Sequence, residues 1–402
     1  MNLNNFPFNE ICLNLNECII PFWKKMKDDE FGGFFESLDN NLNLFKKANK
    51  SSIQTCRILW FFSNAYLLTK NEDCKEYAKH AYHFLNSHLI DKELGGVFWE
   101  VAFDGSSPDT TKTAFAISYA ILALVSFAKI NVEKDSEEAK NQAFELQTLL
   151  EEKYFTENGY VEVLKRDFST LGKDKIFFSK GNFGGSKTMN TILHVIEAYS
   201  QLYEYFPNSF TENKIIYLLT FFENKCFNKE KNCLNIFFDD DFNKTNDYIS
   251  FGHEAEASFL LRRAYEILEK SGIQNSELFN KIEKMCSSLI ENVFSNAYED
   301  GSVVDEVYDE DVKQRRIYWV QADSLLSFFY EAYKYNNEKY FSASKEIWNF
   351  IKNNLIDSRK ESEWLYMIMK NNKKSERPIV FSWKAPYNNA RMCFEILKLQ
   401  KI

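Results

Sequence analysis

The sequence predicts an all-α fold: one domain over residues 1–402 in which twelve helices, arranged as six pairs, close into a toroid. Three observations predict this fold. Apolar residues recur at helical spacing in about twelve segments, a turn motif recurs six times between them, and the first and last helices are as apolar as those in the middle.

The helices follow from composition and periodicity. Hydrophobic residues make up 45% of the chain and aromatic residues 16%, which is enough to build a large core, while only 13 Gly and 6 Pro are present to interrupt helices. Patterns of period two are short and rare, so strands are a minor component. The predicted helices cover residues 10–28, 53–69, 74–89, 113–130, 137–153, 190–206, 212–226, 254–271, 279–294, 318–335, 342–356 and 388–401.

The turns between these helices share one pattern, in which an acidic turn with Gly or Asn precedes a short aromatic or β-branched stretch. It reads DDEFGGFFE, DKELGGVFWE, TENGYVEV, KEKNCLNIFF, YEDGSVVDEV and DSRKESEWLY. The centres lie at Gly32, Gly95, Gly159, Cys233, Gly301 and about Ser362. A repeat of roughly 60 to 75 residues is one helix pair with its connection, and such pairs must stack because none buries its apolar face alone.

Closure of the stack into a ring is favoured by its two ends. An open solenoid needs polar capping repeats, whereas both terminal helices here carry apolar faces. Their apolar residues are Ile19, Ile20, Phe22 and Trp23 in the first helix and Met392, Phe394, Ile396 and Leu397 in the last. An open α-solenoid is the alternative architecture.

Charge and cysteine content exclude several classes of function. The net charge of −9 is spread along the chain without a dense Lys or Arg cluster, so nucleic acid is not an expected partner. The N-terminus lacks a signal-peptide pattern and no apolar run approaches the roughly 20 residues that span a bilayer, so we expect a cytoplasmic protein. The eight cysteines form no CxxC pair, which favours buried free thiols over disulfides or zinc, and no metal site is expected.

Five histidines are present, and they fall into two groups. His80, His83 and His88 follow a strongly charged helix start and are expected to face solvent. In MNTILHVIEAY and FGHEAEASFLL, by contrast, His194 and His253 lie on otherwise apolar helices. His194 shares a helical face with Asn190 and Glu197, and His253 shares one with Glu256. The alternatives are two satisfied core histidines or carboxylate metal ligation, although di-metal bundles use Glu-x-x-His in the reverse order.

Other polar and aromatic clusters occur near the starts of predicted inner helices. They are Gln54, Arg57 and Trp60; Tyr318, Trp319 and Gln321; and Trp383, Tyr387, Asn388, Asn389 and Arg391. Each cluster alone is more often core, but their recurrence predicts a central cleft. Aromatic faces, amides and a guanidinium around imidazoles suit a polyhydroxylated ligand, so we predict a sugar as the partner.

Taken together, the motifs resemble the N-acylglucosamine 2-epimerase and cellobiose 2-epimerase superfamily, and more closely its cellobiose 2-epimerase branch. The matching stretches are GGFFESLD, QTCRILWFF, GGVFWEVAFDG with TTK, KTMNTILHVIEAY, ISFGHEAEASFLL, YWVQAD and WKAPYNNARMCFE, in the family's order over nearly the whole chain. The resemblance implies an (α/α)6 barrel that acts on a reducing-end sugar without metal or nucleotide cofactor.

The resemblance also implies roles for individual residues. His253 would remove the C2 proton of the ring-opened aldose to give a cis-enediolate, and Glu256 would assist ring opening or orient the sugar. His194 would polarise the carbonyl end with Asn190 nearby, and Arg57 would hold the enediolate oxygens. We therefore predict His253, His194 and Glu256 as catalytic residues. The predicted substrate-binding residues are Arg57, Asn190, Trp319, Trp383, Asn388, Phe115 and Tyr318.

Three positions depart from the family pattern. The family's second acid/base histidine, in its PYH motif, is replaced by Asn388, whose amide cannot exchange a proton near neutral pH. A family tyrosine in the TTK helix is replaced by Phe115, and the glutamate after WVQA is replaced by Asp323. Losing one base typically costs about 10²–10⁴-fold in rate.

Three functions remain open after these departures. The first is a sugar 2-epimerase in which another group or a water replaces the missing base. The second is an aldose–ketose isomerase that uses His253 alone, and the third is a non-catalytic sugar-binding relative. In each case we expect His194 and His253 to face one another across a hollow at the centre of the ring. The ligand would be a mono- or disaccharide, and the protein a monomer or homodimer.

Overall fold

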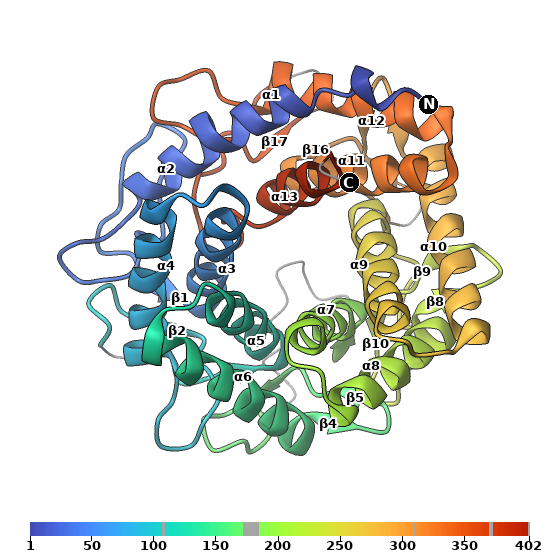
Figure 1. The fold of residues 1–402 in the computed structure, drawn as a ribbon. Coiled ribbons are helices and arrows are strands. Elements are labelled where there is room, and N and C mark those ends of the chain that lie inside the picture. Colours follow the sequence, from blue (N-terminus) through green and yellow to red (C-terminus); the bar gives the residue numbers. More distant parts are fainter. Residues whose placement is uncertain (107–108, 172–184, 309–310, 370–372, 401–402) are drawn as a thin grey trace.

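The computed structural model describes residues 1–106, 109–171, 185–308, 311–369 and 373–400. Its helices form two concentric layers around one axis (Figure 1). The inner layer consists of α3 (Ser52–Thr69), α5 (Ala114–Lys129), α7 (Met189–Tyr205), α9 (Phe251–Lys270), α11 (Tyr318–Tyr335) and α13 (Asn388–Gln400).

The outer layer alternates with the inner one along the chain. Its first member is α1 (Phe8–Leu13), which continues through η2 (Asn14–Ile19) into α2 (Ile20–Lys25). The others are α4 (Glu72–Phe84) with η3 (Leu85–Leu89), α6 (Glu133–Lys153), α8 (Ser209–Phe221) with η4 (Phe222–Cys226), α10 (Ser276–Asn296), and α12 (Glu338–Phe350) with η5 (Ile351–Leu355). All twelve predicted helices are confirmed with shifts of a few residues at their ends; position 401 lies outside the described residues.

Each outer helix ends in one of the six predicted turns, which the structure confirms as small antiparallel hairpins. At four of them the predicted glycine has a positive φ, namely 77° at Gly32 and Gly95, 82° at Gly159 and 71° at Gly301, while Asn232 takes this role at the fourth turn. The hairpins are the bridges Lys27–Phe34, Ile90–Val97 and Ile356–Trp364 and the strand pairs β4–β5 (Phe155–Thr156, Gly159–Tyr160), β8–β9 (Phe227–Asn228, Cys233–Leu234) and β12–β13 (Tyr298–Glu299, Ser302–Val303).

The inner helices begin where a short strand meets a capping side chain. The side-chain oxygens of Ser51, Thr113 and Thr188 accept hydrogen bonds from the third backbone N–H of α3, α5 and α7. Immediately before each of these caps stands a buried lysine that donates hydrogen bonds to the preceding hairpin, the third being Lys187, which donates to the Asn158 carbonyl at 2.7 Å. Lys50 donates to Asp28 and to the Gly32 carbonyl, both at 2.7 Å, and Lys112 pairs with Asp91 in the same way. These bonds satisfy charges that burial would otherwise make costly.

A second set of strand pairs links consecutive connections around the ring. They are β1–β2 (Lys50–Ser51, Glu100–Val101), β3–β6 (Lys112–Thr113, Val163–Leu164), β7–β10 (Lys187–Thr188, Phe237–Phe238), β11–β14 (Ile249–Ser250, Glu306–Tyr308), extended by β15 (Asp311–Lys313), and β16–β17 (Arg316–Ile317, Met367–Ile368). Between the first and last connections, Leu38 and Val380 exchange two backbone hydrogen bonds of 3.1 Å. All inner helices therefore start at the same end of the ring.

The ring is closed, which rules out the open solenoid. α13 packs against both α11 and α3, and α1 packs against α13. The first outer helix is also bonded to the connection after η5 and to α12, since Trp364 donates to Asn14 at 3.2 Å and Trp348 donates to Glu10 at 2.7 Å. The buried apolar side chains form one continuous cluster around the ring. The assignment of residues 1–402 to one domain stays a prediction.

Other expectations from the sequence are met to different degrees. All eight cysteines are free thiols, and six are buried. Within the described ranges, no helix is long and apolar enough to cross a bilayer. Of the three histidines expected at the surface, His83 is exposed, but His80 and His88 are half-buried. His80 donates from Nε2 to the Gly33 carbonyl at 2.8 Å because the first hairpin folds over α4, and the His88 ring packs on Phe84.

Candidate active site

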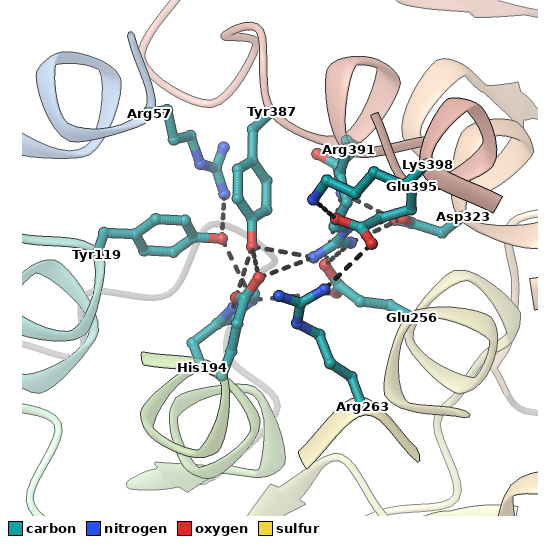
Figure 2. A network of polar contacts seen from close by, with 12 residues as sticks. Arg57, Tyr119, His194, Glu256, Arg263, Asp323, Tyr387, Arg391, Glu395 and Lys398 are labelled. Carbon is teal, nitrogen blue, oxygen red and sulfur yellow. Dashed lines mark hydrogen bonds and ion pairs between the residues drawn. The ribbon is translucent and has the colours of Figure 1, made fainter. Parts of the chain in front are cut away.

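Equivalent positions on the inner helices converge at one level of the ring. The sixth residue of five inner helices is polar and buried: Arg57, Tyr119, His194, Glu256 and Asp323. Because these helices start at the same end, residues equally far from their starts lie at the same depth, and α13 adds Arg391 there (Figure 2). Six helix N-termini also direct their partial positive charge toward this end, which favours an anionic ligand or intermediate.

One half of this polar network runs from α3 through α5 to α7. Arg57 donates through Nη2 to the Tyr119 hydroxyl at 2.9 Å and through Nη1 to the Trp383 carbonyl at 3.2 Å. The Tyr119 oxygen lies 3.3 Å from His194 Nε2, and His194 Nδ1 lies 2.8 Å from Glu197 Oε2. The imidazole of His194 thus has a hydroxyl on one nitrogen and a carboxylate on the other.

The other half of the network is centred on the Arg391 guanidinium. It donates to Glu256 at 2.6 Å, to Asp323 at 2.7 Å and, through Nη1, to Glu197 at 3.3 Å. The Asn388 amide donates to Asp323 Oδ2 at 2.8 Å and to Glu256 Oε1 at 3.5 Å. Three carboxylates therefore share one cation, and the side chain at position 388 lies between two of them.

Burial and charge act in opposite directions on these carboxyl groups. Burial alone would raise the pKa of Glu256, but the positive charge of Arg391 and the nearby imidazoles hold it well below its usual range. For Asp323, burial and the negative charge of Glu256 outweigh Arg391, so its pKa is raised. Burial likewise opposes ionisation of Glu197, yet the hydrogen bond from His194 and the charge of Arg391 lower its pKa. Glu256 and Glu197 are thus ionised, and Asp323 binds a proton more readily than an ordinary aspartate.

A cavity of about 110 Å³ opens beside the network, at the starts of α5, α7 and α9. Four predicted site residues line it: Phe115, Asn190, His253 and Trp383. The remaining lining residues are Trp99, Thr113, Glu162, Val163, Thr188, Thr191, Ile236, Phe237 and Tyr248. The mixture of aromatic rings with a few polar groups is typical of a small-molecule site.

His253 lies in the wall of this cavity. Its Nδ1 is 2.7 Å from the Ser250 hydroxyl, and its ring lies 5.1 Å from the Trp319 ring, which packs over Gly252. The amide oxygen of Asn190 is buried and has no hydrogen-bond partner among the described residues. A ligand hydroxyl could satisfy this oxygen.

The other predicted site residues lie behind the cavity wall. His194, Glu256, Arg57 and Asn388 are each at most 6% exposed and belong to the network. His194 and His253 therefore do not both line the cavity: His253 does, whereas His194 lies behind Phe115, whose ring meets it edge-on at 5.2 Å.

Two predicted substrate-binding residues, Tyr318 and Trp319, neither line the cavity nor belong to the network. Tyr318 is 1% exposed, and its ring packs near the Lys384 amine and Tyr366. Tyr318 shares a polar cluster in the sequence with Trp319, but successive residues of a helix point in different directions.

Several residues of the site were not predicted from the sequence, and Tyr119 and Glu162 are the two that carry hydrogen bonds central to it. Tyr119 lies in the apolar stretch AFAISYAILAL, and only its position as the sixth helical residue could have identified it. Glu162 lies in the third turn motif and accepts hydrogen bonds from the backbone N–H and hydroxyl of Thr188 and from the Thr191 hydroxyl. Burial raises the pKa of Glu162 to about 7. Among the described residues, no cluster of three or more His, Cys, Asp or Glu is arranged to hold a metal ion.

Comparison with known proteins identifies the family. Residues 33–384 match the family model for N-acylglucosamine 2-epimerase. The chain is 36% identical to a cellobiose 2-epimerase from Eubacterium cellulosolvens over 96% of both chains, and 35% identical to one from Ruminococcus albus over 97% of this chain and 98% of the relative.

Solved structures agree with this assignment. The structure of a sugar epimerase from a ruminal bacterium superposes with a TM-score of 0.93 at 34% identity over 98% of both chains. Cellobiose 2-epimerase from Bacillus thermoamylovorans gives a TM-score of 0.92 at 32% identity over 98% of this chain and 99% of the other. A D-mannose isomerase shares the fold at 18% identity. The chain therefore belongs to the N-acylglucosamine 2-epimerase family, as a carbohydrate epimerase of the isomerase class with an (α/α)6-barrel fold.

Proposed function

We propose that this protein is a 2-epimerase for the reducing-end aldose of a glucose- or mannose-type sugar and that it works through a cis-enediolate. The observation that carries the proposal is the His253 imidazole in the wall of an aromatic cavity, one helical turn along α9 from Glu256 of the buried network that Figure 2 shows. Imidazole titrates near neutral pH and can accept or return a proton, as reversible abstraction at C2 requires.

In this mechanism the ring-opened aldose binds with its C2–H directed at His253. The imidazole takes the C2 proton, and the electron pair of that bond moves through C1 onto the carbonyl oxygen to give the enediolate. Arg57 and the six helix N-termini stabilise the negative charge that develops there. Asn190 offers its amide oxygen to a sugar hydroxyl, and Glu256 assists ring opening.

The cavity walls support a sugar as the substrate. The Trp383 ring lies 6.1 Å from that of Trp99 and 5.8 Å from that of Phe115, which gives a continuous aromatic surface for the C–H faces of pyranose rings. The most similar relatives named above are cellobiose 2-epimerases, which supports a disaccharide with a 4-linked glucose unit at its reducing end as the first substrate to test.

A second candidate is an aldose–ketose isomerase. Among the described residues, His253 is the only imidazole that lines the cavity, and position 388 carries an amide that cannot exchange protons. A single base can move a proton between C2 and C1 on one face of a cis-enediol, which yields the ketose. A sugar-binding protein without turnover is the third candidate.

Proton NMR in D₂O separates the three functions, with cellobiose, mannose and glucose as substrates. Deuterium at C2 together with the epimer supports the proposal, whereas ketose formation supports the isomerase and binding without exchange supports the binding protein. His253→Ala should abolish turnover, while His83→Ala, which removes an exposed imidazole from α4, should leave it unchanged. Turnover that survives in His253→Ala would exclude His253 as the base.

A further inference from the structure

Inversion at C2 needs a proton donor for the second face of the intermediate, and Asn388 cannot be that donor. We propose that His194 delivers this proton, oriented by Glu197 and paired with the Tyr119 hydroxyl. This inference rests on the proposed epimerase function and assigns the group that completes it.

Position is the first argument. His194 and Asn388 border the same carboxylate from two sides: His194 Nε2 lies 4.0 Å from Glu256 Oε2, and Asn388 Nδ2 lies 3.5 Å from Glu256 Oε1. The imidazole of His194 therefore lies close to the position that a proton-donating side chain at residue 388 would occupy. The Phe115 ring, which lines the cavity together with His253, meets the His194 ring edge-on at 5.2 Å.

The surroundings of His194 suit a group that must exist in two protonation states. Glu197 holds Nδ1 at 2.8 Å and fixes the ring orientation, as the carboxylate does in a catalytic triad. A protonated ring would lie between the carboxylates of Glu197 and Glu256. The Tyr119 hydroxyl can accept a hydrogen bond from Nε2–H when the ring is charged and donate one to Nε2 when it is neutral.

Tyr119 also accounts for a second departure from the family pattern. Phe115 lacks the hydroxyl expected at that position, but Tyr119 lies one helical turn further along α5, with its ring 5.0 Å away. Its hydroxyl is held by Arg57 at 2.9 Å. Compared with a hydroxyl at position 115, the Tyr119 hydroxyl thus lies deeper inside the ring of helices, next to His194.

Every proton in the proposed reaction is accounted for. The step requires a neutral imidazole at His253 and a protonated one at His194. The C2–H bond breaks as its proton passes to His253, and a new C2–H bond forms on the other face as His194 gives up the Nε2 proton. His253 then releases a proton to solvent and His194 takes one up, so no further reactant is required. The reverse reaction uses the two imidazoles in exchanged roles.

The test is His194→Gln, with two signals followed by NMR in D₂O: loss of C2–H from the substrate pool and appearance of the epimer. Because His253 still removes and returns the proton on its own face, we expect substrate exchange to stay within about tenfold of the wild type, whereas epimer formation falls by about 100-fold or more. Parallel loss of both signals would show that His194 acts only on the carbonyl and would overturn the proposal. Unchanged epimer formation would overturn it as well.

Three further variants distinguish a loss of the proton donor from a folding defect. Adding Asn388→His to His194→Gln restores an imidazole beside Glu256, and epimer formation should recover at least tenfold; a folded double variant without recovery counts against the proposal. Tyr119→Phe should lower epimer formation while sparing substrate exchange, and Tyr154→Phe, which removes a buried hydroxyl at the end of α6, should change neither. Wild-type protein that shows no C2 exchange refutes the epimerase function itself, before any variant is compared.

Discussion

Replacing Arg391 by methionine is expected to lower the melting temperature and to change its pH dependence. Arg391 is 2% exposed and is the shared cation of Glu197, Glu256 and Asp323. Removing one partner of a buried ion pair costs about 3–5 kcal/mol because the remaining charge stays desolvated. Unfolding entropies near 2.1 cal/mol/K per residue give about 0.8 kcal/mol/K for 402 residues, so the melting temperature should fall by about 4–6 °C at pH 7.5.

The sign of the pH effect follows from the carboxyl groups. In the wild type the folded-state pKa values of Glu197 and Glu256 are depressed, so their contribution to stability is present above pH ~4.5 and is lost as the pH falls. Without Arg391, burial dominates and raises these pKa values, so the variant loses stability as the pH rises. The difference in melting temperature between the wild type and Arg391→Met should therefore become smaller from pH 7.5 toward pH 5.

Thermal melts followed by circular dichroism between pH 5 and 8 measure both effects. The matched control is Arg262→Met, since Arg262 is equally buried and pairs with Glu283 and Glu331 away from the network. Arg262→Met should have a similarly reduced melting temperature but unchanged turnover. Arg391→Met should have both a reduced melting temperature and reduced turnover. A melting temperature within about 1 °C of the wild type at pH 7.5, or a difference that does not shrink toward pH 5, would refute the reasoning.

Three further predictions concern single positions. Asn388→His places an imidazole against Asp323 and should raise the initial rate of epimer formation at least tenfold; an unchanged rate would contradict the role assigned to that position. Gly252→Ala would bring its Cβ within 2.4 Å of the Trp319 ring, so the ring must move, at a cost of about 1–3 kcal/mol, and calorimetric titration with substrate should show weaker binding. Because burial raises the pKa of Glu162 to about 7, its contribution to stability is full below pH ~4.5 and is lost as the pH rises through 7. Glu162→Gln should flatten this decline in melting temperature between pH 5 and 8, and identical slopes in the two proteins would count against it.

The fold was largely predictable because two independent patterns in the sequence agree: the helical spacing of apolar residues and the recurrence of the acidic Gly turn. Helical spacing located stretches such as 53–69, and the acidic Gly turns located the hairpins between helix pairs. Closure was inferable from the apolar faces of both terminal helices. The two backbone hydrogen bonds between Leu38 and Val380 could not be predicted, since a bridge of one residue pair leaves no pattern in the sequence.

The site was predictable only in part, for a different reason. Periodicity tells which face of a helix is buried but not what lies opposite after six helices converge. Asn388 contacts Asp323 only because the closed ring brings α13 against α11, and Tyr119 is a network residue only because Arg57 and His194 flank it. Tyr318, conversely, shares a polar cluster in the sequence with Trp319 but is 1% exposed and does not line the cavity.

Closure of the ring also has a consequence for biosynthesis. Asn14 and Trp364 are 350 residues apart in the sequence, and α1 packs against α13, which leaves the ribosome after the other helices of the ring. The apolar face of α1 consequently lacks its α13 partner until the whole ring has been translated. Contacts this distant slow folding, and exposed apolar surface on incomplete chains promotes aggregation. Nascent chains of this protein should depend on chaperones until α13 has emerged.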